Sequence, residues 1–294
     1  MPIQWFPGHM DQTRRRLAAM MPQTDVVIEL LDARLPESSR NPLLDELRRD
    51  VPGRGPEGRP GDVPCVTLLT KDDLADPATT AAWRDVFHTR RGVQTLAVNL
   101  GDRRSVKNVP KLARRLAPKR VDKNKPVRVA VVGIPNVGKS TLVNALRGKS
   151  VAKTGDEPAV TKGPQEVRLE GGLTLTDTPG ILWPKFDDER TGLILAASGA
   201  IKDTAIDDDT VWPWAADYLL EHYPDRLRER YQLPPEAVQA AGHSDAAETL
   251  IDAIGQRRGC LVAGGEVDRT RAGALLLREL RTGKLGRLSL ERPT

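Results

Sequence analysis

The segment VRVAVVGIPNVGKSTLVNAL, residues 127–146, limits the possible folds of this chain more than any other feature. An apolar run typical of a buried strand ends in Gly133, and the residues from there to Ser140 satisfy the pattern G-x-x-x-x-G-K-S/T before a helical pattern begins. Glycines in such a loop let backbone N–H groups close around phosphate oxygens at a helix N-terminus. The segment therefore predicts an α/β domain that binds a phosphorylated nucleotide.

The loop between this strand and this helix gives each residue an expected role. Lys139 is expected to meet the β and γ phosphates, and the Ser140 hydroxyl is expected to hold Mg²⁺. Asn136 has two interpretations: it coordinates a K⁺ ion that supplies positive charge during phosphoryl transfer, or it makes ordinary loop hydrogen bonds. The residues expected to contact the nucleotide here are Asn136, Val137, Gly138, Lys139, Ser140 and Thr141.

A base-recognition motif precedes the phosphate loop in the chain. Thr70, Lys71 and Asp73 fit the pattern N/T-K-x-D at the end of the apolar run CVTLLT. The Asp73 carboxylate would accept hydrogen bonds from the guanine N1–H and exocyclic amine, and the Lys71 stem would cover the ring. Adenine lacks this pair of donors and would leave the carboxylate unpaired, so the motif predicts a preference for guanine. The segment expected to offer a backbone donor to the base oxygen, at the end of the next strand, is Ala97, Val98 and Asn99.

Two further segments are expected to sense the γ-phosphate. In the sequence DTPG, the Asp177 carboxylate would organise the Mg²⁺ shell and the Gly180 N–H would contact the γ-phosphate. Between this segment and the phosphate loop, Thr161 is expected to close over Mg²⁺ and the γ-phosphate, with Thr154 as the alternative. The D-x-x-G pattern also fits an ordinary turn, but its position downstream of a phosphate loop favours the nucleotide interpretation.

The order of these motifs is unusual. In a Ras-like GTPase the phosphate loop comes first, whereas here both base-recognition segments precede it and the two switch segments follow it. A closed α/β domain tolerates relocated termini because termini usually lie at the surface and near one another. The order therefore predicts a circularly permuted GTPase, in which loss of the γ-phosphate acts through switch II directly on the part of the chain that follows.

Apolar runs alternate with helical patterns through the first part of the chain, as in a doubly wound α/β sheet. Strands are predicted at 25–33, 64–70, 93–99, 127–133 and 173–180, and helices at 10–21, 41–49, 79–90, 109–118 and 140–148. The segment 51–64, rich in glycine and proline, is predicted to be a mobile surface insertion. After about residue 185 the strand pattern stops and only helical patterns follow, which predicts a GTPase domain over 1–185 and a smaller all-helical C-terminal domain over 186–294.

Charge is unevenly distributed along the chain. The net charge is +5, yet eleven basic residues and one acid lie between Arg103 and Arg128, and nine basic residues and four acids lie between Arg257 and Arg292. Two such clusters favour a polyanion partner, although solvated helix faces are the ordinary alternative. Aromatic residues make up only 4% of the sequence, which favours phosphate contacts over base stacking.

Cysteine spacing and hydropathy exclude several classes of protein. Cys65 and Cys260 lie far apart and support neither a disulfide framework nor a zinc site. The opening MPIQWFPGHM lacks the pattern of a signal peptide, and no stretch approaches the ~18 apolar residues of a membrane span. We therefore expect a cytoplasmic protein without a membrane partner. No DNA partner is expected, and the expected state is a monomer.

The residues that follow Gly180 are Ile181 and Leu182, and neither can orient a water molecule as the glutamine of Ras-type enzymes does. Intrinsic turnover is therefore expected to be slow and to be accelerated by an assembly partner. His9 is one candidate for orienting water, with a structural or exposed histidine as the alternative. The K⁺ ion at Asn136 is the other candidate. The expected catalytic residues are His9, Lys139, Thr161 and Gly180.

Together these motifs resemble the ribosome biogenesis GTPase A family, the YlqF/RbgA type. The resemblance rests on WFPGHM at 5–10, DARLP at 32–36, GIPNVGKSTL at 133–142, DTPGILWPK at 177–185 and a tail that begins GCLVAGGEVD. It implies GTP and GDP as ligands with Mg²⁺, and a role in late assembly of the large ribosomal subunit, with ribosomal RNA contacted by the helical domain. Departures from the family are Pro158–Ala159, the segment 52–64 and Thr70, where asparagine is usual, so that a weaker tether to the phosphate loop is expected.

Two other functions share parts of this pattern. A metabolic ATPase or kinase would share the phosphate loop but has no use for the motif at 70–73. Competition between ATP and GTP separates that alternative. A nucleotide-regulated module that binds a protein or membrane partner with negligible turnover would share the whole site. Hydrolysis rates with and without ribosomal subunits separate the second alternative.

Overall fold

The computed structural model describes residues 14–15, 17–54, 56, 59–147, 167–169, 171–176, 189–201, 208–239 and 242–293. The chain separates into two compact units, one comprising Gln4–Lys185 with Glu291–Thr294, and the other comprising Phe186–Leu290 with Met1–Ile3. Within the described ranges, none of the helices combines the length and the apolar character needed to cross a membrane.

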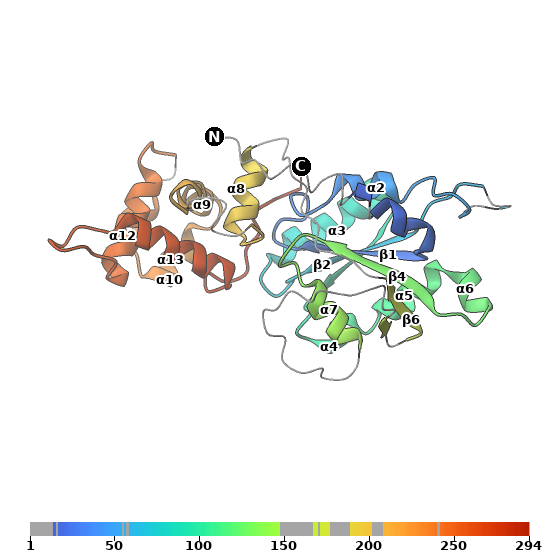
Figure 1. The fold of residues 1–294 in the computed structure, drawn as a ribbon. Coiled ribbons are helices and arrows are strands. Elements are labelled where there is room, and N and C mark those ends of the chain that lie inside the picture. Colours follow the sequence, from blue (N-terminus) through green and yellow to red (C-terminus); the bar gives the residue numbers. More distant parts are fainter. Residues whose placement is uncertain are drawn as a thin grey trace. The chain divides into compact units, whose positions relative to one another are not determined.

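A six-stranded sheet forms the centre of the first unit, with strand order β3-β2-β1-β4-β6-β5 (Figure 1). All neighbouring strands pair in parallel except β5 and β6, which are antiparallel. The five strands predicted from apolar runs are confirmed, whereas the three-residue edge strand β5 was not predicted. The strands are β1 (Val26–Asp32), β2 (Cys65–Thr70), β3 (Gln94–Val98), β4 (Val127–Gly133), β5 (Val167–Leu169) and β6 (Leu173–Thr176).

Helices cover both faces of this sheet, as the doubly wound prediction requires (Figure 1). On one face, side chains of α2 (Pro42–Leu47) and α3 (Pro77–Arg91) share a core with β1 and β2, which includes Leu44, Trp83 and Phe87. Asp76 caps the start of α3 by accepting a hydrogen bond from the Thr79 N–H at 2.7 Å. The helices drawn on the opposite face are α4 (Arg103–Val106), α5 (Val109–Leu116) and α7 (Lys139–Leu146), and α6 (Pro118–Asp122) follows α5.

The segment 51–64 is anchored at both of its ends. Val51 and Val63 are buried, and Val51 forms a β-bridge with Gly61. Arg54 also reaches the carboxylate of Asp25, at 3.2 Å. This anchoring differs from the predicted mobile insertion because two valines flanking the glycine- and proline-rich stretch are hydrophobic enough to join the core.

The second unit is helical over its described residues, as predicted. Its helices are α8 (Glu189–Ala197), α9 (Asp208–His222), α10 (Pro224–Tyr231), α11 (Pro235–Gln239), α12 (Ala246–Arg258) and α13 (Arg269–Arg281). Close approach of α9 and α13 requires glycine, since a Cβ on Gly273 would lie 2.3 Å from Cδ1 of Trp212. Gly283, with φ of 75°, terminates α13, and the Lys284 N–H donates to the Glu279 carbonyl at 3.0 Å. This is a Schellman motif.

Candidate nucleotide-binding site

The predicted nucleotide-binding segments lie at one edge of the sheet. Strands β1 to β4 run parallel, so the loops that follow them all leave from the same edge. The phosphate loop follows β4, the motif at 70–73 follows β2, and the segment 97–99 ends β3. The chain crosses from β3 at the sheet margin to β4 beside β1, which makes this edge a topological switch point. Open α/β sheets bind ligands at such points.

The phosphate loop has a backbone shape that only glycine permits at two positions. A Cβ on Gly133 would lie 2.6 Å from the carbonyl oxygen of Leu30. Gly138 has φ of 104°, and a Cβ there would lie 2.5 Å from Cδ1 of Leu100. Asn136 also lies in the left-handed region, with φ of 57°, which asparagine tolerates better than most residues. Glycine at these two positions therefore permits the backbone shape of the loop, which fits a phosphate group.

Lys139 begins α7 and points back over the loop. Its ammonium donates to the carbonyl oxygens of Gly133 at 3.0 Å and Ile134 at 2.6 Å. Burial lowers the pKa of Lys139 to about 8, because removing an ammonium from water disfavours its charged form. Negatively charged phosphate groups would relieve that cost, so the lysine fits its predicted role. Ser140 and Thr141 are exposed in the first turn of α7.

Thr70 connects the base-recognition motif to the phosphate loop. Its hydroxyl is fully buried and donates to the Val137 carbonyl at 2.7 Å, and it also lies 3.1 Å from the Leu31 carbonyl. The two residues joined are 67 positions apart in the chain. The threonine hydroxyl therefore makes the tether that was expected to be weaker without asparagine.

Replacing Thr70 with valine should remove this tether and leave the buried Val137 carbonyl without its donor. We expect a loss of about 1–3 kcal/mol in the free energy of unfolding, together with weaker GDP binding. Urea unfolding and titration with a fluorescent GDP analogue measure the two effects. Thr95→Val is the matched control, because its buried hydroxyl has no hydrogen-bond partner in the described structure. Equal effects of the two substitutions would contradict the assigned role of Thr70.

Lys71 is held in place by a carboxylate from another strand. Its backbone has φ of 56°, and its ammonium lies 2.9 Å from Oδ2 of Asp32 at the end of β1. Asp32 is buried and makes a bidentate pair with Arg34, at 3.0 and 2.8 Å. Burial opposes ionisation of Asp32, but the charges of Arg34 and Lys71 outweigh it and hold the pKa of the carboxyl well below its usual range. A charged Asp32 thus fixes the lysine stem expected to cover the base.

The sequence motifs do not by themselves place these two residues at the site. Asp32 and Arg34 belong to the segment DARLP, which is shared with the family but has no assigned role in the pattern of nucleotide motifs. The available signal was its position directly after a predicted strand, since that strand is parallel to the one carrying the base motif. Asp73 is exposed at the same edge, and its charge acts on the guanidinium of Arg34.

The segment 97–99 ends β3, which pairs with the strand that carries the base motif. The Asp72 N–H donates to the Val98 carbonyl at 3.5 Å. The Asn99 N–H donates to the Ser105 hydroxyl at 2.9 Å, and the Asn99 side chain accepts from the Gly101 N–H at 2.8 Å. A base oxygen would have to compete with Ser105 for the Asn99 donor. Ala97 is half-buried, and Val98 is fully buried.

The remaining predicted residues lie outside the described part of the chain. They include the candidate water-orienting histidine, both switch threonines and the two DTPG residues, namely His9, Thr154, Thr161, Asp177 and Gly180. Of the predicted Mg²⁺ ligands, Ser140 alone is described. The described residues contain no group of three or more His, Cys, Asp or Glu side chains placed to hold a metal ion.

Known proteins are similar to this chain over its whole length. Residues 128–207 match the family described as 50S ribosome-binding GTPase. Ribosome biogenesis GTPase A of Priestia megaterium is 42% identical, and the alignment covers 100% of this chain and 98% of that protein. The chain belongs to the ribosome biogenesis GTPase A family.

Other members of the ribosome biogenesis GTPase A family and related proteins agree with this assignment. The Thermotoga maritima protein is 29% identical, with 99% of this chain and 95% of that protein covered. Mitochondrial ribosome-associated GTPase 1 of Ictalurus punctatus is 33% identical, with 98% and 92% covered. The GDP-bound structure of TM YlqF has a TM-score of 0.61 at 26% identity, covering 95% of this chain and 99% of that one. The predicted P-loop fold with permuted motif order and a helical C-terminal region is therefore confirmed.

Membership in the ribosome biogenesis GTPase A family settles the class of chemistry. The chain is a GTPase, and the family binds GTP and GDP, typically with Mg²⁺. The resemblance inferred from the motifs is confirmed, and the ATPase or kinase alternative is wrong.

Proposed function

We propose that this chain hydrolyses GTP as an assembly factor for the large ribosomal subunit. Membership in a family of ribosome biogenesis GTPases supports this proposal. The observation that carries it is the 2.7 Å contact between Thr70 and Val137, which brings a guanine-recognition motif and a phosphate loop together at one edge of the sheet. The two motifs can then engage opposite ends of a single nucleotide.

We assign the ligands of the nucleotide and its ions as follows. Asp73 and Lys71 would bind the base, helped by the segment 97–99, and Lys139 would bind the phosphates. Bound Mg²⁺ supplies positive charge that neutralises the phosphate oxygens during transfer. Its proposed ligands are Ser140, Thr161 and Asp177, with Gly180 contacting the γ-phosphate. Asn136 would hold K⁺, and its left-handed backbone is compatible with an exposed side chain above the loop.

The two parts of the chain have different proposed functions. Residues 1–185 would bind and hydrolyse GTP, and residues 186–294 would contact ribosomal RNA. Arg257, Arg271 and Arg278 are exposed on α12 and α13 and offer positive charge for that contact. Because the DTPG segment directly precedes the helical unit, γ-phosphate loss would act on the RNA-contacting part first. The protein would act as a monomer in the cytoplasm.

GTP hydrolysis with purified ribosomal subunits tests this function. We expect slow turnover alone, strong stimulation by large subunits and little by small subunits. We also expect faster turnover in K⁺ than in Na⁺ buffer if Asn136 holds the ion. Equal rates with and without large subunits would support instead a nucleotide-regulated binding module with negligible turnover.

The proposed role of His9 has a separate test. His9→Ala should leave GTP affinity near normal and remove the stimulation by large subunits, because only the partner-assisted reaction would use the imidazole to orient water. His88→Ala is a matched control, since His88 is an exposed histidine on α3. Undiminished stimulation of the His9 variant would exclude this histidine from catalysis.

A further inference from the structure

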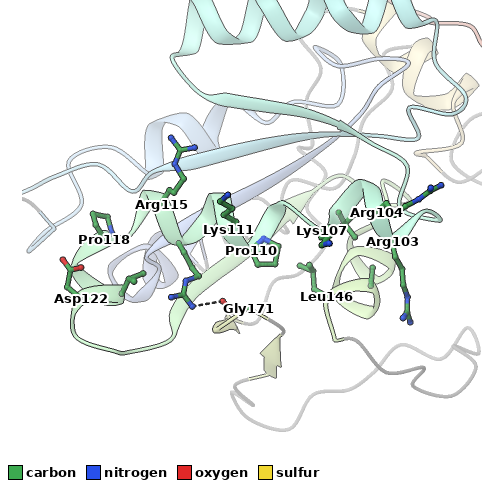
Figure 2. A pocket seen from close by; sticks show the side chains of 14 residues that line it. Arg103, Arg104, Lys107, Pro110, Lys111, Arg115, Pro118, Asp122, Leu146 and Gly171 are labelled. Carbon is green, nitrogen blue, oxygen red and sulfur yellow. Dashed lines mark hydrogen bonds between the residues drawn. The ribbon is translucent and has the colours of Figure 1, made fainter.

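A groove of about 810 Å³ lies on the GTPase unit. Side chains of α4, α5 and α6 form its length, and the end of α7 and the turn at Gly171 complete it (Figure 2). Its floor is apolar and includes Val106, Pro110 and Leu146. Cations dominate its rim, and Asp122 is the single acidic side chain among the described residues that line it. The groove therefore combines a shaped surface with a strong positive field.

The cations of the groove follow one line. Figure 2 shows Arg103 and Arg104 at one end, Lys107 and Lys111 in the middle, and Arg115 toward the other end. Along this path the chain passes from α4 into α5, and the exposed positions recur at roughly helical spacing. A row of cations suits a polymer that carries negative charge along its length.

Most of these cations have no counter-charge among the described residues. Within the described structure, Arg103, Lys107, Lys111 and Arg115 form no ion pair, and all four are exposed. Arg104 does pair with Asp102, at 3.3 Å. Like charges held close together repel one another, so a bound polyanion would be favoured by relief of that repulsion as well as by direct attraction.

Other cations of the same sequence cluster serve the fold instead. Arg120 and Arg128 pair with Asp25 at 3.1 and 3.0 Å. Burial opposes ionisation of Asp25, but its hydrogen bonds and pairing with arginine outweigh it, and the pKa of Asp25 is lowered. Within the described structure, the groove therefore holds four cations of the cluster that form no ion pair, namely Arg103, Lys107, Lys111 and Arg115.

The wall of the groove at the β5–β6 turn is fixed by close contacts. A Cβ on Gly171, where φ is 72°, would lie 2.5 Å from Cβ of Pro110. Arg114 donates to the Gly171 carbonyl at 3.2 Å, a bond drawn in Figure 2. This guanidinium therefore joins α5 to the sheet edge and shapes the groove. A preformed shape lowers the entropy cost of binding.

We propose that this groove binds the phosphodiester backbone of RNA, as a contact surface on the GTPase unit additional to the helical unit. The inference rests on the proposed function, which makes RNA the partner. None of the described residues that line the groove is aromatic, which favours phosphates over stacked bases as its ligand. A continuous row of phosphates satisfies the whole line of cations, whereas an acidic peptide offers carboxylates at irregular intervals.

The groove also borders elements of the nucleotide site. The helix α7 starts at Lys139 and ends at Leu146 in the groove. On α4, which also lines the groove, the Ser105 hydroxyl accepts a hydrogen bond from the Asn99 N–H, at 2.9 Å. RNA bound along α4 and α5 would therefore lie against α7, which follows the phosphate loop, and α4, which follows the proposed base segment.

Binding of fluorescein-labelled oligo(U) to the full chain tests the proposal. The test variant is Lys107→Gln/Lys111→Gln, and the matched control is Arg49→Gln/Arg84→Gln, which removes two exposed cations elsewhere on the same unit. Loss of two phosphate contacts should reduce the slope of log K against log salt by about 1.4, which at ~0.1 M salt corresponds to roughly 25-fold weaker binding. The control should bind like the unmodified protein, and intrinsic GTP hydrolysis should be unchanged in both variants.

Three results would overturn the groove assignment. The first is an equal loss in both variants, which indicates unspecific attraction. The second is no loss in the Lys107/Lys111 variant. The third is competition by poly-L-glutamate as effective as that by unlabelled oligo(U), which indicates an acidic protein partner.

Co-sedimentation of the unmodified protein with large subunits separates this inference from the proposed function. If the unmodified protein neither co-sediments nor is stimulated, the proposed function fails. If it does both while the Lys107/Lys111 variant binds oligo(U) and subunits equally well, only the groove assignment fails.

Discussion

Lys139→Ala is expected to abolish binding of GTP and GDP at micromolar nucleotide concentrations. The half-buried ammonium is held above the phosphate loop by the Gly133 and Ile134 carbonyls, at 3.0 and 2.6 Å. Its charge is therefore already in place for the phosphates, and alanine would leave them with backbone donors alone. Truncating a buried partner of a charged ligand costs about 2–5 kcal/mol, which corresponds to roughly 30-fold to several thousandfold in affinity.

Titration with a fluorescent GDP analogue measures this loss. Lys119→Ala is the control, because it removes an exposed lysine from α6 of the same unit and should change nothing. Urea unfolding of both variants checks that the fold is intact. An intact Lys139 variant that binds GDP within threefold of the unmodified protein would refute the assignment of the phosphate loop.

Asp73→Asn should shift the preference of the protein from GTP toward XTP. Two hydrogen bonds to a charged acceptor contribute about 3–6 kcal/mol together, so GTP affinity should fall by roughly two to four orders of magnitude. Xanthine carries an oxygen where guanine has its amine, and the asparagine amide can donate to that oxygen. The carboxylate is exposed at the strand edge, close enough for its charge to act on buried Arg34, so it is available to a base.

Competition between GTP and XTP for a fluorescent nucleotide tests the shift. Asp85→Asn is the matched control, since Asp85 is exposed on α3. A GTP preference that survives in the Asp73 variant would remove this residue from base recognition. The Lys139 and Asp73 experiments together examine both ends of the same nucleotide.

Most of the sheet could be predicted because buried parallel strands are continuous apolar runs. β1 and β4 show this clearly, since nearly all their residues lie in the core. β5 could not be predicted, because three residues at an antiparallel edge carry no recognisable period. The anchoring of 51–64 was missed for a related reason: its glycines and prolines dominate the local pattern, while two valines decide its packing.

Some features of the candidate site could likewise be predicted from the sequence, and others could not. The phosphate loop and the base motif could be read from the sequence, because each needs particular residue types within a few positions of one another. The support of Lys71 by Asp32 could not be read from the sequence, since it depends on two strands lying side by side in register. The Thr70 tether likewise depends on residues 67 positions apart coming into contact.

The sequence by itself determined which chemistry is available: a phosphate loop, a guanine motif, their permuted order and an excess of positive charge between Arg103 and Arg128. Only the tertiary structure decided which of those charges are neutralised by acidic side chains. Arg120 and Arg128 meet Asp25, whereas Lys107 and Lys111 face a groove without a counter-ion in the described structure. Charge is a property of each residue, but its neutralisation depends on distances between residues far apart in the chain, and folding alone sets those distances.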